Sequence, residues 1–466
     1  MSDNSKAKTI GELRDSGYEV LPVKQEVRRN LIRKIEAGEE MFPDIIGFDE
    51  SVIPQLENAI LAGQDLILLG ERGQAKSRLI RNIVTLLDEE IPAIEGCELN
   101  DDPFDPICKS CQSRIAENGD EVEVRWIPRD HRYSEKLATP DITVADLIGE
   151  IDPIKVAEGR YLSDELTIHY GLIPRTNRGI FCINELPDLS ERIQVSLFNL
   201  MQERDVQIKG YQIMLPLDVF LVCSANPEDY TNRGRIVTPL KDRYGAQIRT
   251  HYPRSLEEEI DIVEQEHSSF PDTNEVVSVP QYMKEVIAEF TSLARRSPEI
   301  NQRSGVSLRV SIANYETIVG NAFKRSLRLR ERAAPRVSDL PAIVASTTGK
   351  VEMESVEEGR EYKVVDDLIK KAVLNTFGRY FNPREFTDVL ARFEEGLVIE
   401  TGADVQSDAY TSKLSQMANL SEMVERIEPS DDPASIASAI ELILEGLHLN
   451  RRLNRDQSGG TYVYSS

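Results

Sequence analysis

The chain has 466 residues and a formal net charge of −25, with 40% hydrophobic and 29% charged residues. This length exceeds one ordinary hydrophobic core, so we expect about two to four domains. So acidic a chain is a poor candidate for general nucleic-acid binding, which needs Lys and Arg to neutralise phosphates, and we expect no direct nucleic-acid binding.

The first segment, MSDNSKAKTIGELRDSG, lacks the apolar core of a signal peptide. No run of about 18 apolar residues occurs, so no membrane span is expected. Five cysteines in a chain of this length do not make a disulfide framework. These features predict a cytoplasmic protein in a reducing compartment.

Short apolar runs, continuous rather than alternating, recur through the first half of the chain. They end at Gly70, Ile127, Asn184 and Asn226. Such runs are typical of parallel strands buried on both faces, and their alternation with helical patterns indicates an α/β sheet. We therefore predict an N-terminal helical extension over residues 1–40 and a P-loop α/β parallel-sheet core over residues 41–266.

Two segments interrupt the alternation of strands and helices. Between Val206 and Leu215, apolar residues alternate on either side of Lys209 and Gly210, which predicts a β-hairpin. The stretch from Leu147 to Thr176 is predicted to form a second insertion that protrudes from the core.

The pattern becomes helical after about residue 271. Pro280 precedes a segment whose apolar residues recur on one helical face. We predict a helical lid over residues 267–348 and a further helical region over residues 349–453. The tail over residues 454–466 has no periodicity, and we predict that it is disordered.

The sequence GERGQAKS nearly matches the phosphate-binding pattern G-x-x-x-x-G-K-[ST]. In such a loop, backbone N–H groups and a helix N-terminus hold phosphates, the lysine reaches the outer phosphates, and the Ser or Thr binds Mg²⁺. A predicted strand precedes the loop and a predicted helix follows it, so we predict binding of ATP and Mg²⁺. The candidate nucleotide-binding residues are Gly70, Glu71, Arg72, Gly73, Gln74, Ala75, Lys76 and Ser77.

Ala75 stands where this pattern has its last glycine. The exchange matters only if the position needs a positive φ or cannot accept a methyl group. Because the backbone near a helix start usually turns toward the right-handed helical region, we predict that the loop remains competent. The alternative is an accidental match in a strand–helix turn.

A second acidic element is expected at the end of the strand in GIFCINELPDL. A typical site has Asp-Glu there, with the Asp in the Mg²⁺ shell and the Glu acting on the attacking water. This chain has Asn184 and Glu185. We predict that Glu185 is the catalytic base, and that Asn184 joins the metal shell without the charge of a carboxylate, which weakens Mg²⁺ binding or slows turnover.

Two further polar residues complete the pattern. Asn226 ends a third strand, where its side chain could touch the γ-phosphate or its water. Arg243, in LKDRYG, could reach the nucleotide of a neighbouring subunit and stabilise transition-state charge. Alone, such an arginine is more often a surface ion-pair residue, but together and in this order these motifs indicate a nucleotide hydrolase.

The motifs resemble AAA+ ATPases of the MoxR and magnesium-chelatase I-subunit branch over roughly residues 42–309. FPDIIGFDESV, GERGQAKS, SANPEDY, LKDRYG and GVSLR carry this resemblance, and the run over residues 148–189 is its most specific part. The resemblance implies that Gly47 and Phe48 lie near the adenine and that Asn226 is the first sensor. It also implies that Arg243 is the arginine finger and that Arg309, on the lid, is the second sensor.

The same resemblance implies a homo-oligomeric ring, a hexamer, that hydrolyses ATP and remodels a protein partner, for which a von Willebrand A-domain protein is a candidate. One alternative is a nucleotide-gated scaffold with little turnover, which Ala75 and Asn184 motivate. Another is a MoxR-type chaperone unrelated to porphyrin metallation. A transcriptional activator of the AAA+ type is disfavoured, because the sequence has no GAFTGA-like loop and no basic DNA-binding domain.

Three cysteines lie close together in GCELNDDPFDPICKSCQSR. Cys108 and Cys111 have the C-x₂-C spacing of metal ligands, and Cys97 precedes them. A tetrahedral zinc site needs four ligands, and the nearest histidine in the sequence is His131. The sequence leaves open a structural zinc site and an ordinary reduced loop.

Overall fold

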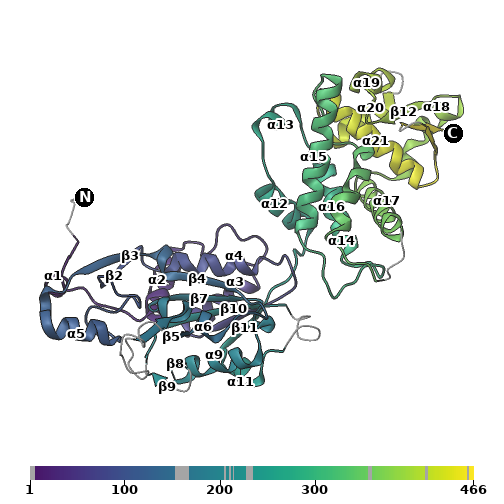
Figure 1. The fold of residues 1–466 in the computed structure, drawn as a ribbon. Coiled ribbons are helices and arrows are strands. Elements are labelled where there is room, and N and C mark those ends of the chain that lie inside the picture. Colours follow the sequence, from purple (N-terminus) through teal and green to yellow (C-terminus); the bar gives the residue numbers. More distant parts are fainter. Residues whose placement is uncertain are drawn as a thin grey trace. The chain divides into compact units, whose positions relative to one another are not determined.

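The computed structural model describes residues 6–152, 167–203, 206–208, 211–213, 215–226, 235–354, 359–414, 418–458 and 461–466. The chain divides into two compact units, Met1–His251 and Tyr252–Ser466 (Figure 1). The expected α/β core ran to residue 266, but helix α12 (Leu256–Glu266) belongs to the second unit.

A five-stranded parallel sheet forms the centre of the first unit, in the order β11-β1-β10-β7-β4. Its strands are β1 (Leu66–Leu69), β4 (Tyr133–Leu137), β7 (Gly179–Asn184), β10 (Val219–Ala225) and β11 (Ala246–Arg249). Strands β1 and β7 are buried along their whole length, which explains their continuous apolar sequences. The predicted P-loop α/β fold is confirmed.

Helices cover both faces of this sheet. Alternate strand residues point to opposite faces, so Leu66 and Leu68 pack in one cluster and Ile67 and Leu69 in another. Helices α3 and α4 lie over one face, and α9 and α11 lie over the other (Figure 1). Among its described residues, this unit has helices α1 (Ile10–Asp15), α2 (Val23–Ala37), α3 (Val52–Leu61), α4 (Lys76–Ile83), α5 (Lys109–Asn118), α6 (Val144–Leu147), α8 (Leu172–Arg175), α9 (Glu191–Glu203) and α11 (Thr238–Arg243).

One apolar run does not join the main sheet. The run that ends at Ile127 forms β3 (Val124–Pro128), which pairs antiparallel with β2 (Glu90–Ile94) in a separate two-stranded sheet. Its expected place in the parallel sheet is therefore wrong. The strand that pairs with β7 at this edge of the sheet is β4, which carries Glu135 and Lys136. None of its residues is buried, so its sequence has no continuous apolar run that would predict a strand.

Both predicted insertions contain an antiparallel strand pair. Strand β8 (Val206–Ile208) pairs with β9 (Tyr211–Ile213), and β5 (Gly149–Ile151) pairs with β6 (Ile168–Tyr170). The turn residues Lys209 and Gly210, and residues 153–166 of the other insertion, lie outside the described residues. The predicted hairpin before β10 is confirmed by its two paired strands.

The second unit is mainly helical. One hydrophobic cluster runs through it from Val263 to Tyr464, so the expected lid and the expected C-terminal region share a core. Besides α12, its helices are α13 (Pro271–Val276), α14 (Gln281–Ala294), α15 (Arg309–Leu329), α16 (Val344–Thr348), α17 (Arg360–Tyr380), α18 (Thr387–Glu394), α19 (Ser407–Leu414), α20 (Ala418–Ile427) and α21 (Pro433–Leu449). Within the described ranges, no helix has the length and apolar character needed to cross a bilayer.

The C-terminal tail is structured, contrary to expectation. Strands β13 (Asn454–Ser458) and β14 (Thr461–Ser465) pair with each other, and β14 pairs with β12 (Ile399–Gly402). Tyr464 is 2% exposed, and its hydroxyl donates to Glu445 Oε2 at 2.6 Å. Contacts to α21 thus order a segment too short and polar for its sequence to predict a strand.

Candidate functional site

The phosphate loop connects β1 to α4 at the carboxyl edge of the sheet. Lys76 is 7% exposed, and its Nζ donates to the backbone oxygens of Gly70 at 2.5 Å and Glu71 at 2.8 Å. Ser77, the second residue of α4, has an exposed side chain. No side chain caps the start of α4, so its first N–H groups can receive an anion.

The side chain of Gln74 fixes the shape of this loop. Its Oε1 accepts from the Glu71 N–H at 3.1 Å and from Thr250 Oγ1 at 2.8 Å. Thr250 directly follows β11, so a neighbouring strand anchors the loop. A Cβ added at Gly70 would lie 1.9 Å from Thr250 Oγ1, which explains the glycine there. Sequence reasoning missed Thr250, because only the strand order brings it to the loop.

The expected backbone conformation of Ala75 is wrong. Its φ of 52° and ψ of 15° lie in the left-handed region, as does the φ of 77° at Gly73. The left-handed conformation costs an L-residue roughly 1–2 kcal/mol, whereas glycine adopts it freely. The last glycine of the pattern is therefore a conformational requirement, and Ala75 meets it at a cost.

The end of β7 lies at the same edge of the sheet as the phosphate loop, because the strands are parallel. Asn184 ends β7 and pairs in register with Leu137 of β4. Its Nδ2 donates to Glu135 Oε1, and its Oδ1 accepts from Ser224 Oγ at 3.0 Å. The amide is thus held between a carboxylate of β4 and a hydroxyl of β10.

Glu135 supplies a carboxylate beside this amide. It accepts from Arg81 Nε at 3.0 Å and from the Tyr133 hydroxyl at 2.9 Å. Burial raises the pKa of Glu135, but the hydrogen bonds from Arg81 and Tyr133 outweigh it and hold that pKa below its usual range. Arg81 follows Ser77 by four residues in α4, so both lie on one helix face. No sequence pattern identifies Glu135, because its role depends on the pairing of β4 with β7.

Glu185 follows directly after β7, with φ 56° and ψ 49°. Its N–H donates to Ser224 Oγ at 3.3 Å, so Ser224 contacts both residues of the Asn-Glu pair. Asn226, 2% exposed, follows directly after β10, which lies between β1 and β7. The phosphate loop, Asn226 and Glu185 therefore leave three adjacent parallel strands at one edge.

The residues expected near the adenine pack against the segment after β11. Phe48 is 5% exposed, and its ring meets His251 edge to face with centroids 5.0 Å apart. Ser51 Oγ lies 2.7 Å from His251 Nε2, and Gly47 has a φ of 81°. His251 follows Thr250, which anchors the phosphate loop. Contact with an adenine ring stays a prediction.

The two predicted arginines lie on helices and not at the strand ends described above. Arg243 ends α11, and its NH1 pairs with Asp242 Oδ2 at 3.0 Å while part of the side chain remains exposed. Arg309 begins α15 in the second unit and has an exposed side chain. Arg72, in the loop itself, is also exposed. The finger and second-sensor roles stay predictions.

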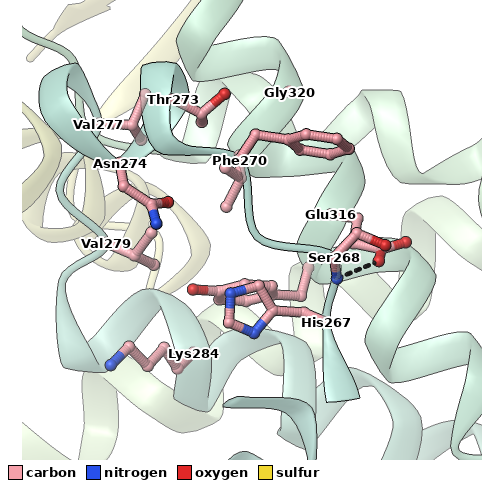
Figure 2. Close-up of a pocket in the computed structure, with 12 residues that line it drawn as sticks. His267, Ser268, Phe270, Thr273, Asn274, Val277, Val279, Lys284, Glu316 and Gly320 are labelled. Carbon is pink, nitrogen blue, oxygen red and sulfur yellow. Dashed lines mark hydrogen bonds between the residues drawn. The ribbon is translucent and has the colours of Figure 1, made fainter. Parts of the chain in front are cut away.

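A cavity of about 410 Å³ lies within the second unit (Figure 2). His267, Phe270 and Lys284 line it, and beside it the Ser268 N–H donates to Glu316 at 2.8 Å. None of its lining residues belongs to the predicted nucleotide site. We therefore place the candidate site at the sheet edge and not in this cavity.

Sequence comparisons connect the chain to known ATPases. The family model described as the Sigma-54 interaction domain matches residues 158–240. The chain is 29% identical over 235 residues to the magnesium-chelatase subunit ChlI-2 of Arabidopsis thaliana, covering 48% of this chain and 51% of that protein. It is 27% identical over 346 residues to the magnesium-chelatase subunit ChlI of Nostoc, covering 69% of this chain and 87% of that protein. The chain thus spans about half the length of the first relative.

Two solved structures were also matched. A complex of the magnesium-chelatase subunits BchI and BchD contains a chain that is 20% identical, with a TM-score of 0.36 and coverage of 70% of this chain and 98% of that chain. NtrX from Brucella abortus is 13% identical, with a TM-score of 0.37 and coverage of 75% and 67%. From the sequence relatives and the arrangement of its motifs, the chain resembles the AAA+ ATPases of the magnesium-chelatase I-subunit type.

Proposed function

We propose that the chain binds and hydrolyses ATP and uses the energy, as a ring-forming motor, to remodel or activate a protein partner. The convergence of the phosphate loop, Asn226 and Glu185 on one edge of a parallel sheet carries this proposal. In open α/β sheets, ligands bind in the crevice outside the carboxyl ends of the strands.

Each residue at this edge has a chemical task. Lys76 exchanges the backbone oxygens of Gly70 and Glu71 for the outer phosphates, and the first N–H groups of α4 hold the inner ones. Glu185 orients the attacking water and accepts its proton, while Asn226 hydrogen-bonds the water or the γ-phosphate. The Ser224 hydroxyl, which touches both Asn184 and Glu185, fixes the position of the pair.

The same edge offers the oxygen ligands that Mg²⁺ prefers. Ser77 presents its hydroxyl at the helix start, and Asn184 lies beside the carboxylate of Glu135. When bound, Mg²⁺ neutralises charge on the phosphates during transfer. We propose that Ser77 and Asn184 hold the metal shell and that Glu135 supplies the negative charge that Asn184 lacks.

The proposed assembly is a homo-oligomeric ring, a hexamer, in the cytoplasm. Arg243 supports it, because a partly exposed arginine at the end of α11 can reach the site of a neighbouring subunit and stabilise transition-state charge there. The relatives are named as subunits, which supports a protein partner, and a von Willebrand A-domain protein is our candidate. The alternative is that the chain remodels this partner as a MoxR-type chaperone, unrelated to porphyrin metallation.

Light scattering after size-exclusion chromatography tests the assembly. The wild-type chain is expected to form a ring with ATP and Mg²⁺, and Arg243→Ala to assemble but release phosphate at least about tenfold more slowly. Arg14→Ala, which changes an exposed arginine on α1, is the control. A wild-type chain that stays monomeric under all nucleotide conditions would contradict the ring.

A nucleotide-gated scaffold is the second candidate. The left-handed Ala75 and the amide at Asn184 favour it, because both weaken groups that hydrolysis needs. Fluorescent-nucleotide titration and phosphate release on the same sample separate the two functions. Tight ATP binding with Mg²⁺-dependent release supports the motor, and tight binding without release supports the scaffold.

A further inference from the structure

Four buried side chains converge where the loop after β2 enters α5, away from the residues used above. Cys97, Asp101, Cys108 and Cys111 each offer one ligand atom, and these atoms all lie within 4.8 Å of one another. None of the four side chains is more than 7% exposed. The three cysteines leave a tetrahedral site one ligand short, and Asp101 occupies the fourth place in this group. His131, the nearest histidine in the sequence, is exposed.

Backbone N–H groups already point at the sulfur and oxygen atoms of this cluster. The Leu99 N–H donates to Cys97 Sγ at 3.3 Å, and the Cys111 N–H donates to Cys108 Sγ at 3.4 Å. The Cys108 N–H donates to Asp101 Oδ2 at 3.1 Å. Such donors stabilise thiolate and carboxylate, which are the metal-binding forms of these side chains.

Asp101 provides an independent reason to place a cation here. The residue is fully buried, and its Oδ1 has no hydrogen-bond partner in the part of the chain that the structure describes. A buried carboxylate oxygen without a partner is costly unless a cation or donor compensates it. Ordinary packing of three buried cysteines explains the thiols but not this carboxylate.

The donor set selects the metal. Three thiolates and one carboxylate around a small volume give the four-coordinate sites that Zn²⁺ occupies in proteins. All three cysteines are free, so no disulfide competes for them. We propose that Cys97, Asp101, Cys108 and Cys111 bind one structural Zn²⁺ ion.

The location of the site indicates what the metal stabilises. Leu99, between two ligands, accepts from Asn177 Nδ2 at 2.9 Å, and Asn100 Nδ2 donates to the Arg175 oxygen at 3.1 Å. Residues 175–178 lead directly into β7, the strand that ends at Asn184. The metal therefore holds the loop that supports the start of β7, and it takes no part in phosphate chemistry at the opposite strand end.

The test begins with the metal content of the full wild-type chain, purified without chelator and analysed by elemental mass spectrometry. We expect about one Zn²⁺ per chain. Replacement by Co²⁺ should give the visible absorption of a tetrahedral thiolate site. A chain that binds neither Zn²⁺ nor Co²⁺ when each is offered in slight excess would overturn the proposal.

Variants then assign the ligands. Asp101→Asn keeps the size of the side chain and should lower Zn²⁺ affinity at least about tenfold in a chelator competition. Cys108→Ser should lose the metal, and Cys182→Ala, which changes a buried strand cysteine, is the control that should keep it. Equal metal content and affinity in Asp101→Asn and the wild type would exclude Asp101 as a ligand. Equal loss in Cys182→Ala would show that the effect is not specific to the loop.

Discussion

The phosphate loop and the end of β7 each depart from the pattern of a nucleotide hydrolase by one residue, and the structure treats the two departures differently. At Ala75 the backbone keeps the left-handed conformation that a glycine would adopt, so the exchange leaves strain that no neighbouring side chain can remove. At Asn184 the amide donates to the Glu135 carboxylate of the adjacent strand, and we propose that this carboxylate supplies the missing charge. A requirement set by backbone conformation must be met by the residue itself, whereas a requirement for charge can be met from a neighbour.

The comparison depends on the loop being the nucleotide site, and Lys76→Ala tests this with the largest expected effect. The change removes the buried ammonium group that lies over Gly70 and Glu71, and we expect ATP affinity to fall at least about 100-fold. Fluorescent-nucleotide titration measures it. Lys34→Ala, which changes a lysine on α2 that pairs with Glu39 at 3.9 Å, is the control and should bind as the wild type does. Unchanged affinity in Lys76→Ala would move the site elsewhere.

The role of Glu135 is tested by exchanging the amide and the carboxylate. Glu135→Gln should lower Mg²⁺-dependent phosphate release about tenfold, because it removes the only carboxylate beside Asn184 among its described hydrogen-bond partners. Asn184→Asp alone should not raise the rate, since the new carboxylate would face that of Glu135. The double variant should return to within a few-fold of the wild type.

Titration of phosphate release against Mg²⁺ concentration measures these three variants together. A non-additive cycle, in which the double variant is faster than either single one, is the expected result. If the two changes simply add, Glu135 does not replace the charge that Asn184 lacks.

Ala75→Gly tests the strain in the phosphate loop and should have a smaller effect. Relief of the left-handed strain, less the extra flexibility of glycine in the unfolded chain, should raise the free energy of unfolding of the first unit by about 0.5–1 kcal/mol. Urea denaturation followed by Trp126 fluorescence measures it. The same substitution at Ala62, where φ is −84°, is the control and should destabilise. Destabilisation by both would show that position 75 tolerates alanine without strain.

The smallest effect concerns pH. The pKa of Glu135 in the folded chain is below its usual range, so its ion pair stabilises the fold above the unfolded pKa of about 4.3. That contribution is lost as the pH falls through the folded pKa. The difference in urea midpoint between the wild type and Glu135→Gln should therefore shrink from pH 7 toward pH 3. Glu40→Gln, which changes an exposed residue, is the control. Its urea midpoint should match that of the wild type at pH 7. A difference for Glu135→Gln that grows at low pH would contradict the account.

Parts of this architecture could be predicted from the sequence because a local pattern carries them. Strands β1, β7 and β10 are apolar along their length since helices cover both sides, and the loop residues Lys76 and Ser77 follow β1 directly. Strand β4 was missed because it has no apolar run, and β3 was misplaced because an apolar run does not reveal its partner.

The contacts that complete the site could not be predicted in the same way. Glu135 precedes Asn184 by 49 residues, and Thr250 follows Gln74 by 176, so only the strand order brings each pair together. Asp101 lies within the cysteine segment but does not follow the spacing of a common zinc motif, and folding of the loop brings it to the thiols. The conformation at Ala75 was foreseeable in one respect, since the glycine in the pattern itself signals a positive φ.

If Glu185 acts on the attacking water at the edge of the sheet, then Glu185→Gln must slow phosphate release without weakening ATP binding. The measurement compares the variant with the wild type at saturating ATP and Mg²⁺, after both have been shown to bind the nucleotide with similar affinity. We expect the wild type to turn over and Glu185→Gln to bind ATP but release phosphate at least about 100-fold more slowly. Equal rates for the two proteins, whether fast or near zero, would contradict it.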